Sequence, residues 1–260
     1  KVAPDHLASH IVLAKLDLVQ GRKDEFKSRL NWLQKNHPQN PEVKLLAARR
    51  DSGDKDYEQA VSKLSSLLED APNTTVVTEL ALNQWKSGDR QGAISSLQLW
   101  TQENEQDSKV LMLLARLHLE NNDFESARKT YEKLEQILPN QPAVLNNIAW
   151  TLKESDPKQG IVYAEKALSL AEGNPMILDT LGMLQYEVGD NQKALQLLTE
   201  AANAAPKRLD IQFNYARMLA VNKRKNEAKE HLYKLQQMAR SGEIKSLIQR
   251  QIDSLPDTDL

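Results

Sequence analysis

Small and aliphatic residues recur along the chain with a period of 33 or 34 residues. Around the recurring positions, Leu, Ile and Val stand three or four residues apart with polar residues between them, which is the pattern of an amphipathic helix. One set of recurring positions is Ala14, Ala48, Ala81, Ala115, Ala149, Gly182 and Ala216, and a second set is Phe26, Ala60, Ala93, Ala127, Gly160, Ala194 and Ala228. Two such sets in one period, with Phe26 as the exception in the first unit, predict a repeat of two helices whose small residues let the backbones approach closely.

The period divides residues 1–242 into seven tandem units, followed by one further amphipathic helix. In the sixth unit, Leu181 and Leu184 lie on the first helix, Gly189-Asp190 forms the turn and Pro206 ends the second helix. The units are residues 7–40, 41–73, 74–107, 108–141, 142–174, 175–208 and 209–242, and residues 243–260 hold a capping helix and tail. The sequence therefore predicts an all-α solenoid of about fifteen helices without strands.

The pattern resembles the tetratricopeptide repeat (TPR), the 34-residue helix–turn–helix family, over residues 7–242. The signature Trp at the fourth position of that repeat is missing here. The resemblance implies a right-handed TPR superhelix. In it, the first helix of each hairpin lines a concave groove and the second forms the convex back. It also implies that the groove holds a protein partner, either an extended segment or a folded domain.

A narrower resemblance rests on two segments, residues 145–150 (LNNIAW), followed by a short Asp156-Pro157 turn, and residues 178–182 (LDTLG). These segments resemble the C-terminal region of the TPR-repeat lipoproteins of PEP-CTERM/exosortase systems, which are linked to exopolysaccharide export. That resemblance implies a piece of a longer array, carried by a lipid anchor outside this chain. It also implies a periplasmic location at the outer membrane. A cytoplasmic location is the alternative.

Composition excludes several classes of function. Lys and Arg number 34 against 36 Asp and Glu, so the net charge is −2 and there is no basic footprint for nucleic acid. The chain has no Cys, no glycine-rich phosphate loop and no apolar run long enough for a transmembrane segment. His6 and His10 lie one helical turn apart without a third ligand, so we expect no metal site. The sequence predicts a protein that is not an enzyme and has no cofactor.

The repeat phase predicts which side chains line the groove. One column of the first helices holds cations and large apolar residues, and the next holds amides that can bond a peptide backbone. The predicted partner-binding residues are Arg116, Asn147, Trp150, Asp179, Met183, Tyr186, Asn214 and Arg217. We expect Glu79 and Glu120 to pair with Arg49 and Arg116. In the competing interpretation, Trp150 packs between repeats as core and Tyr186 covers a neighbouring helix.

These features predict a non-catalytic protein–protein interaction scaffold that uses the concave groove. Its setting would be a bacterial envelope complex for exopolysaccharide biosynthesis or export. The alternative is a carbohydrate-binding or enzyme-regulating subunit of the same kind of system, in which Trp150 and Tyr186 would stack on sugar rings. An enzyme with an active site in the groove has almost no support in the sequence.

Overall fold

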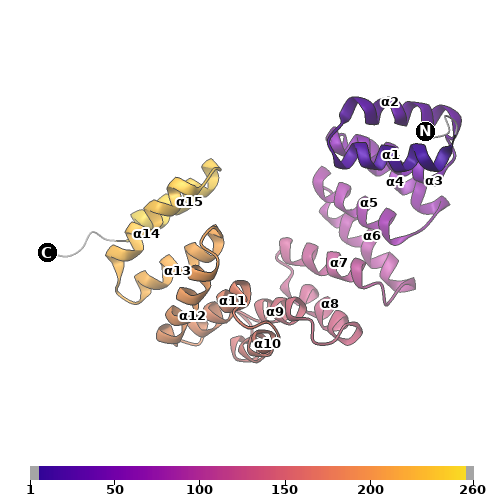
Figure 1. Cartoon of the computed structure of the whole chain (residues 1–260). Coiled ribbons are helices and arrows are strands. Elements are labelled where there is room, and N and C mark those ends of the chain that lie inside the picture. The colour runs from indigo at the N-terminus through magenta and orange to yellow at the C-terminus, as the bar shows by residue number, and fades with distance from the viewer. Residues whose placement is uncertain (1–5, 256–260) are drawn as a thin grey trace. The chain divides into compact units, whose positions relative to one another are not determined.

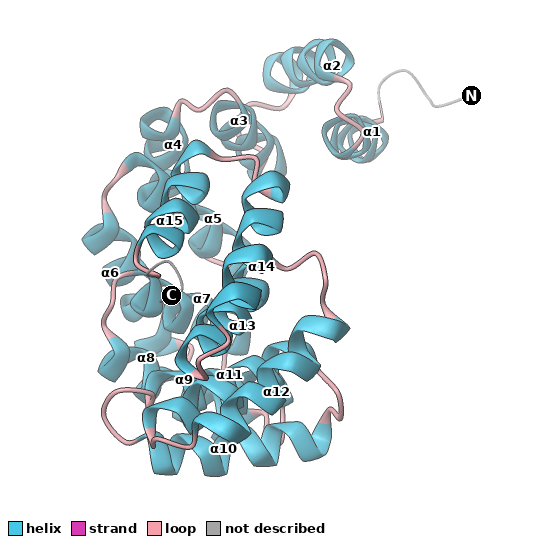
Figure 2. Ribbon diagram, turned by 90° about the vertical axis from the view of Figure 1, so that its left-hand side faces the viewer, coloured by secondary structure: helices cyan, strands magenta, loops and turns pink. Residues whose placement is uncertain are grey.

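The computed structural model describes residues 6–255, and these form fifteen α-helices and no strand (Figures 1 and 2). The prediction of an all-α chain of consecutive helical hairpins is confirmed. The helices are α1 (Leu7–Val19), α2 (Lys23–Asn36), α3 (Pro41–Gly53), α4 (Tyr57–Asp70), α5 (Thr74–Ser87), α6 (Arg90–Glu103), α7 (Ser108–Glu120), α8 (Phe124–Ile137), α9 (Pro142–Thr151), α10 (Pro157–Leu170), α11 (Pro175–Glu187), α12 (Asn191–Ala204), α13 (Leu209–Val221), α14 (Lys225–Met238) and α15 (Gly242–Asp253). None of the helices within this described range is long and apolar enough to cross a membrane.

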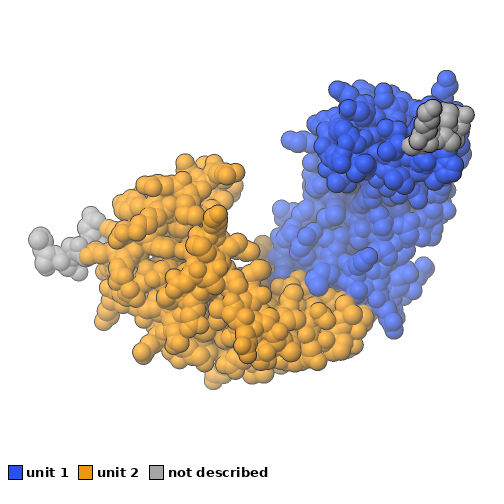
Figure 3. Space-filling view, viewed as in Figure 1, with its two compact units in different colours: residues 1–121 blue, residues 122–260 orange. Residues whose placement is uncertain are grey.

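The helices belong to two compact units, residues 1–121 and 122–260 (Figure 3). In the first unit, α1 pairs with α2, α3 with α4 and α5 with α6, and α7 packs on α6. In the second unit, α8 packs on α9, and the pairs α9–α10, α11–α12 and α13–α14 are followed by α15. The two helices of the predicted unit 108–141 thus fall in different compact units. The superhelical course of the whole array stays a prediction.

Short turns of similar sequence join the first and second helices of the repeats. In four of them a residue with positive φ is followed by an aspartate whose carboxylate accepts a bond from the next helix's backbone. Gly88 and Gly189 supply φ values of 96° and 87°, which glycine adopts without steric cost. Asp190 accepts from the amide of Lys193 at 3.0 Å and so satisfies one of the free donors at the start of α12.

The second helix of every pair carries its recurring packing residue at the same place, the fourth helical position. The count from the first residue of the helix gives Phe26, Ala60, Ala93, Ala127, Gly160, Ala194 and Ala228. Gly160 stands one residue early in the repeat period because α9 is shorter than the other first helices. The turn between α9 and α10 is longer than the turn between α11 and α12, but it makes up only part of the difference. The packing register is therefore counted from the helix start and not from the preceding helix.

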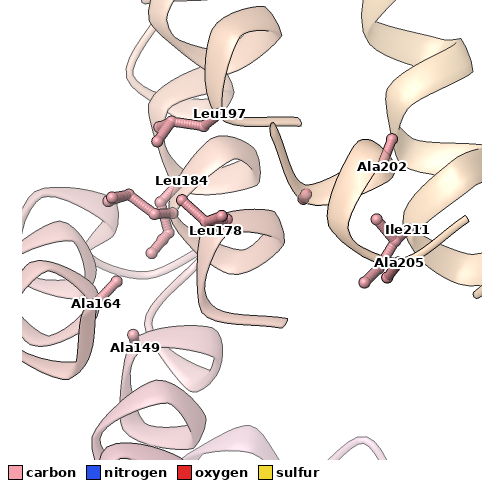
Figure 4. Packing of buried hydrophobic residues seen from close by; sticks show 10 residues of the cluster. Ala149, Ala164, Leu178, Leu184, Leu197, Ala202, Ala205 and Ile211 are labelled. Atoms are coloured by element: carbon pink, nitrogen blue, oxygen red, sulfur yellow. The ribbon is translucent and has the colours of Figure 1, made fainter. Parts of the chain in front are cut away.

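The recurring small residues are buried because neighbouring helices touch there. Ala149 has no exposed surface, and it lies in a core cluster with Ala164 and Leu184 (Figure 4). A β-carbon added at Gly182 would lie 2.7 Å from Leu198 Cγ, and one at Gly160 would lie 3.0 Å from the backbone oxygen of Ala149. Both distances are too short for a normal contact, so these sites admit only glycine without a shift of their neighbours.

Candidate functional site

The first helices of three consecutive pairs, α9, α11 and α13, lie next to one another in the second unit. Their facing side chains leave a pocket of about 260 Å³, which we call the α9–α11–α13 pocket. It is lined by Asn146, Asn147 and Trp150 from α9, Met176, Asp179 and Thr180 from α11, and Arg208, Asp210, Ile211 and Asn214 at and after the start of α13. The regular side-by-side placement of first helices is what gathers these residues.

The carboxylate of Asp179 is the central charged group of the pocket. The side-chain amide of Asn214 donates to both of its oxygens, at 3.0 and 3.1 Å. Burial raises the pKa of Asp179 to about 6, and the negative charge of Asp210 adds to the rise, while the Asn214 bond and the charge of Arg208 oppose it. A pKa near 6 means that the pocket holds a poorly solvated negative charge at neutral pH.

Arg208, the cationic residue that lines the pocket, already pairs with a carboxylate. Arg208 forms a bidentate pair with Asp210, with nitrogen–oxygen distances of 3.0 and 2.5 Å. This pair holds the pKa of the Asp210 carboxyl below its usual value, chiefly through the hydrogen bonds from Arg208. Because the guanidinium plane faces Asp210, Asp179 keeps no direct salt bridge among the described residues.

One buried amide oxygen in the pocket, Asn146 Oδ1, lacks a hydrogen-bond partner among the described residues. Asn146 is 7% exposed. The neighbouring Thr180 hydroxyl bonds within its own helix, to the backbone oxygen of Met176 at 3.0 Å. A buried oxygen without a partner costs free energy, and a ligand that donates to it would remove that cost.

Trp150 is partly buried, and its ring packs on a cluster formed by Met183, Leu198 and Met218. The ammonium of Lys153 lies over the ring, 4.9 Å from its centroid. Trp150 also lines the α9–α11–α13 pocket. It therefore combines core packing with a surface that a ligand can reach, so neither interpretation of this residue excludes the other.

The expectation that Met183 is exposed in the groove is wrong. Its side chain is 3% exposed, because Ala194 and Leu198 of α12 and Met218 of α13 enclose it. Tyr186 is partly buried against the same cluster and does not line the α9–α11–α13 pocket.

Arg116 and Arg217, the two predicted partner-binding arginines, and Arg49 all lie outside the lining of this pocket. Arg116 belongs to the first unit, and its guanidinium lies 3.6 Å from the carboxylate of Glu120. Nε and Nη2 of Arg49 both donate to Glu79 Oε1, at 2.9 and 2.6 Å, so both expected pairings are confirmed. Arg217 lies on α13, one turn beyond Asn214, outside the lining of the pocket. We leave all three arginines out of the candidate site.

A second pocket, of about 250 Å³, is also lined by Trp150. It is lined by Phe124, Glu125, Trp150, Thr151, Lys153, Glu154 and Ser155, and Phe124 is 37% exposed. Sequence reasoning missed this pocket, because Phe124 is the first residue of α8 and stands outside the columns counted along the first helices. A large apolar residue at the start of a second helix was the signal that could have shown it.

Comparisons with known proteins agree with this architecture. Two family models described as tetratricopeptide repeat match residues 84–149 and residues 180–243. No curated protein sequence matches the chain.

Three solved structures illustrate the similarity of fold. A tetratricopeptide repeat protein from Parabacteroides merdae has a TM-score of 0.76 at 13% identity, and the match covers 95% of this chain and 98% of that one. The C-terminal part of a TPR repeat-containing protein from Cytophaga hutchinsonii has a TM-score of 0.66 at 12% identity, over 92% and 98%. A chain of the APC/C hetero-tetramer Cut9–Hcn1 has a TM-score of 0.64 at 15% identity; the match covers 96% of this chain and 50% of that one, which is about twice as long. At such identities the likeness shows the fold alone.

Proposed function

This chain is a tetratricopeptide repeat protein, and from that premise we propose that it is a non-catalytic scaffold whose second unit holds an extended segment of a partner protein at the α9–α11–α13 pocket. Proteins of this family mediate protein–protein interactions, and the coarse function follows from membership. The location of the binding site does not follow from membership and rests on the residues of this chain.

The observation that carries the proposal is the meeting of amide, carboxylate and indole groups on three adjacent first helices. Asn147 and Asn214 can each donate and accept, which suits the alternating donors and acceptors of an extended backbone. Trp150 offers rigid apolar area that loses little side-chain entropy on binding. A pocket of about 260 Å³ is smaller than the roughly 300–1,000 Å³ of sites for whole small molecules, so it suits one side chain of a longer segment.

Selection of peptides on the purified chain tests this site. A random peptide library displayed on phage should yield binders on the wild-type chain. The selected peptides should bind Asn147→Ala and Trp150→Ala about tenfold more weakly or worse.

Matched controls come from the second helices of the same unit. Asn203→Ala on α12 and Val162→Ala on α10 truncate an exposed amide and an exposed aliphatic side chain. Both controls should bind the peptides as the wild type does, with circular dichroism confirming that every variant is folded. Equal binding by the pocket variants and the controls would place the partner surface elsewhere.

The proposal extends to a biological setting, a bacterial envelope complex for exopolysaccharide biosynthesis or export in the periplasm. Its support is the resemblance of residues 145–150 and 178–182 to the TPR lipoproteins of exosortase systems. Deletion of the gene in its host should reduce secreted polysaccharide, and fractionation should find the protein in the envelope. Unchanged secretion together with a cytosolic protein would refute this setting while leaving the binding site intact.

The carbohydrate alternative has weaker support, because stacking on a sugar needs an open aromatic face. The rings of Trp150 and Tyr186 pack on the Met183 cluster, and Lys153 lies over Trp150. Titration with oligosaccharides, read as the fluorescence difference between the wild type and Trp150→Phe, would reveal a sugar site at this residue.

A further inference from the structure

The α9–α11–α13 pocket presents hydrogen-bond acceptors that its own residues leave under-used. The two carboxylate oxygens of Asp179 share one donor group, the amide of Asn214. The buried Oδ1 of Asn146 has no partner among the described residues. Acceptors without donors in a poorly solvated pocket favour a guest that carries several N–H groups.

The pocket also carries a negative charge that the neighbouring cations do not neutralise directly. Arg208 is held by Asp210 in a bidentate pair. Lys153 lies over the ring of Trp150, and its ammonium is 3.9 Å from a carboxylate oxygen of Glu187. Both cations therefore have partners other than Asp179. A partly buried carboxylate without an ion pair gains from a cation supplied by a ligand.

We infer that the pocket takes a basic side chain, an arginine or lysine, of the partner's extended segment, with the cation against the Asp179 carboxylate and a donated bond to Asn146 Oδ1. This inference rests on the proposed function, because it specifies what the segment places in the pocket. Trp150 and the half-exposed Met176 line the same pocket and give apolar surface for the aliphatic stem of such a side chain.

Other guests fit these groups less well. An acidic side chain would meet the charges of Asp179 and Asp210 at close range. A neutral amide could bond Asn146 Oδ1 but would leave the Asp179 carboxylate without a counter-charge. The arrangement thus distinguishes a basic residue from its neutral analogue of similar shape.

An NMR titration with small probes tests the charge requirement directly. N-acetyl-arginine amide and N-acetyl-lysine amide should shift the side-chain amide signals of Asn146 and Asn214. N-acetyl-citrulline amide, which has the shape of the arginine probe without its charge, should bind about tenfold more weakly. Equal shifts with the arginine and citrulline probes would overturn the inference.

Two variants that each remove one negative charge distinguish a direct contact between the probe and Asp179 from attraction by the net charge of the protein. Asp179→Asn removes the pocket carboxylate and should abolish the preference for arginine over citrulline. Asp190→Asn, at the start of α12, also removes one negative charge but keeps a side chain able to cap the helix. It should retain the preference, and its loss in both variants would mean that net charge alone attracts the probe.

The peptides selected on the wild-type chain provide the second test, and they separate this inference from the proposed function. The inference requires one arginine or lysine at a fixed place in the selected peptides, and loss of that residue when selection is repeated on Asp179→Asn. Peptides that need Asn147 and Trp150 but carry no such basic residue would refute the inference and leave the proposed function standing. Peptides indifferent to Asn147 and Trp150 would refute the proposed function itself.

Discussion

At the scale of single residues, the α9–α11–α13 pocket is dominated by the partly buried carboxylate of Asp179 and by the Asn214 amide that donates to it. Counting along the first helices puts Asn147, Asp179 and Asn214 on one face, and the structure has all three lining one pocket. Their role in binding stays a prediction. The burial of Met183 could not be read from the same count, because it depends on side chains of α12 and α13 that close over it.

The raised pKa of Asp179 has a consequence for stability. In the unfolded chain this carboxyl has an ordinary pKa of 3.8, and in the folded chain about 6, so the folded state binds the proton more tightly. The free energy of unfolding should therefore fall as pH rises from about 4 to 6 and stay lower above that range. The charged neighbours that face this carboxyl, Asp210 and Arg208, are included in the shift.

Asp179→Asn should accordingly stabilise the protein at pH 8 by about 1–2 kcal/mol, because it removes a poorly solvated charge and keeps an acceptor for Asn214. At pH 4 the variant and the wild type should have nearly equal stability. Urea unfolding at the two pH values measures both differences. A variant less stable than the wild type at pH 8 would show that the carboxylate is already well compensated in the free protein.

Trp150 and Asn147 should differ in what their loss costs. Trp150→Ala should lower the free energy of unfolding by about 2–4 kcal/mol, because the ring packs on the Met183 cluster. Asn147→Ala should change it by less than about 0.5 kcal/mol, because Asn147 is a partly buried residue at the pocket surface. Thermal melts of both variants measure the contrast. Equal destabilisation by the two would show that Asn147 has a structural role.

At the scale of helices, the sequence predicts the elements well because most of them carry a capping residue at their start. Aspartate at the start of α4, α6, α8, α10 and α12 caps the backbone, and the residue before it often has positive φ. These signals are local, so they can be read without the structure. How tightly two helices approach is not local, and it appears only in the contacts at Gly160 and Gly182.

The approach of α11 and α12 can be tested by a double-mutant cycle. Gly182→Ala should destabilise the protein by about 1–3 kcal/mol, because the new methyl group would meet Leu198 Cγ at 2.7 Å. Leu198→Ala alone should cost about 2–5 kcal/mol through the cavity it leaves. The double variant should lose less stability than the two single variants lose together, because Leu198→Ala makes room for the methyl group of Gly182→Ala. Additive costs would mean that the strain at Gly182 is relieved elsewhere.

At the scale of the whole molecule, the sequence predicts how many helices there are but not where the chain divides into compact units. The boundary falls between residues 121 and 122, inside a turn that has the same left-handed residue and aspartate cap as the turns before α4, α6 and α12. A period that repeats alike on both sides carries no mark of this division. It follows from the sum of packing contacts, which no single repeat contains.

In a linear repeat array, a destabilising substitution should weaken the helices nearest to it most. In Gly182→Ala, amide hydrogen exchange should accelerate most in α9–α13, which share clusters with α11, and least in α1–α4. Mass spectrometry of exchanged peptides measures the profile. Uniform acceleration over all helices would instead indicate that the two units unfold as one cooperative body.

The packing residue stands at the fourth position of every second helix, and this fixed position determines where the chain tolerates insertions and deletions. A residue added to or removed from a turn leaves the count from the helix start untouched, and the count holds at Gly160 although α9 is shorter, and the turn after it longer, than in the α11–α12 pair. A residue added inside a helix would rotate every later side chain by about 100° and turn the packing face away. Insertions and deletions should therefore accumulate in the turns during evolution, and a foreign epitope or fluorophore site is best engineered there.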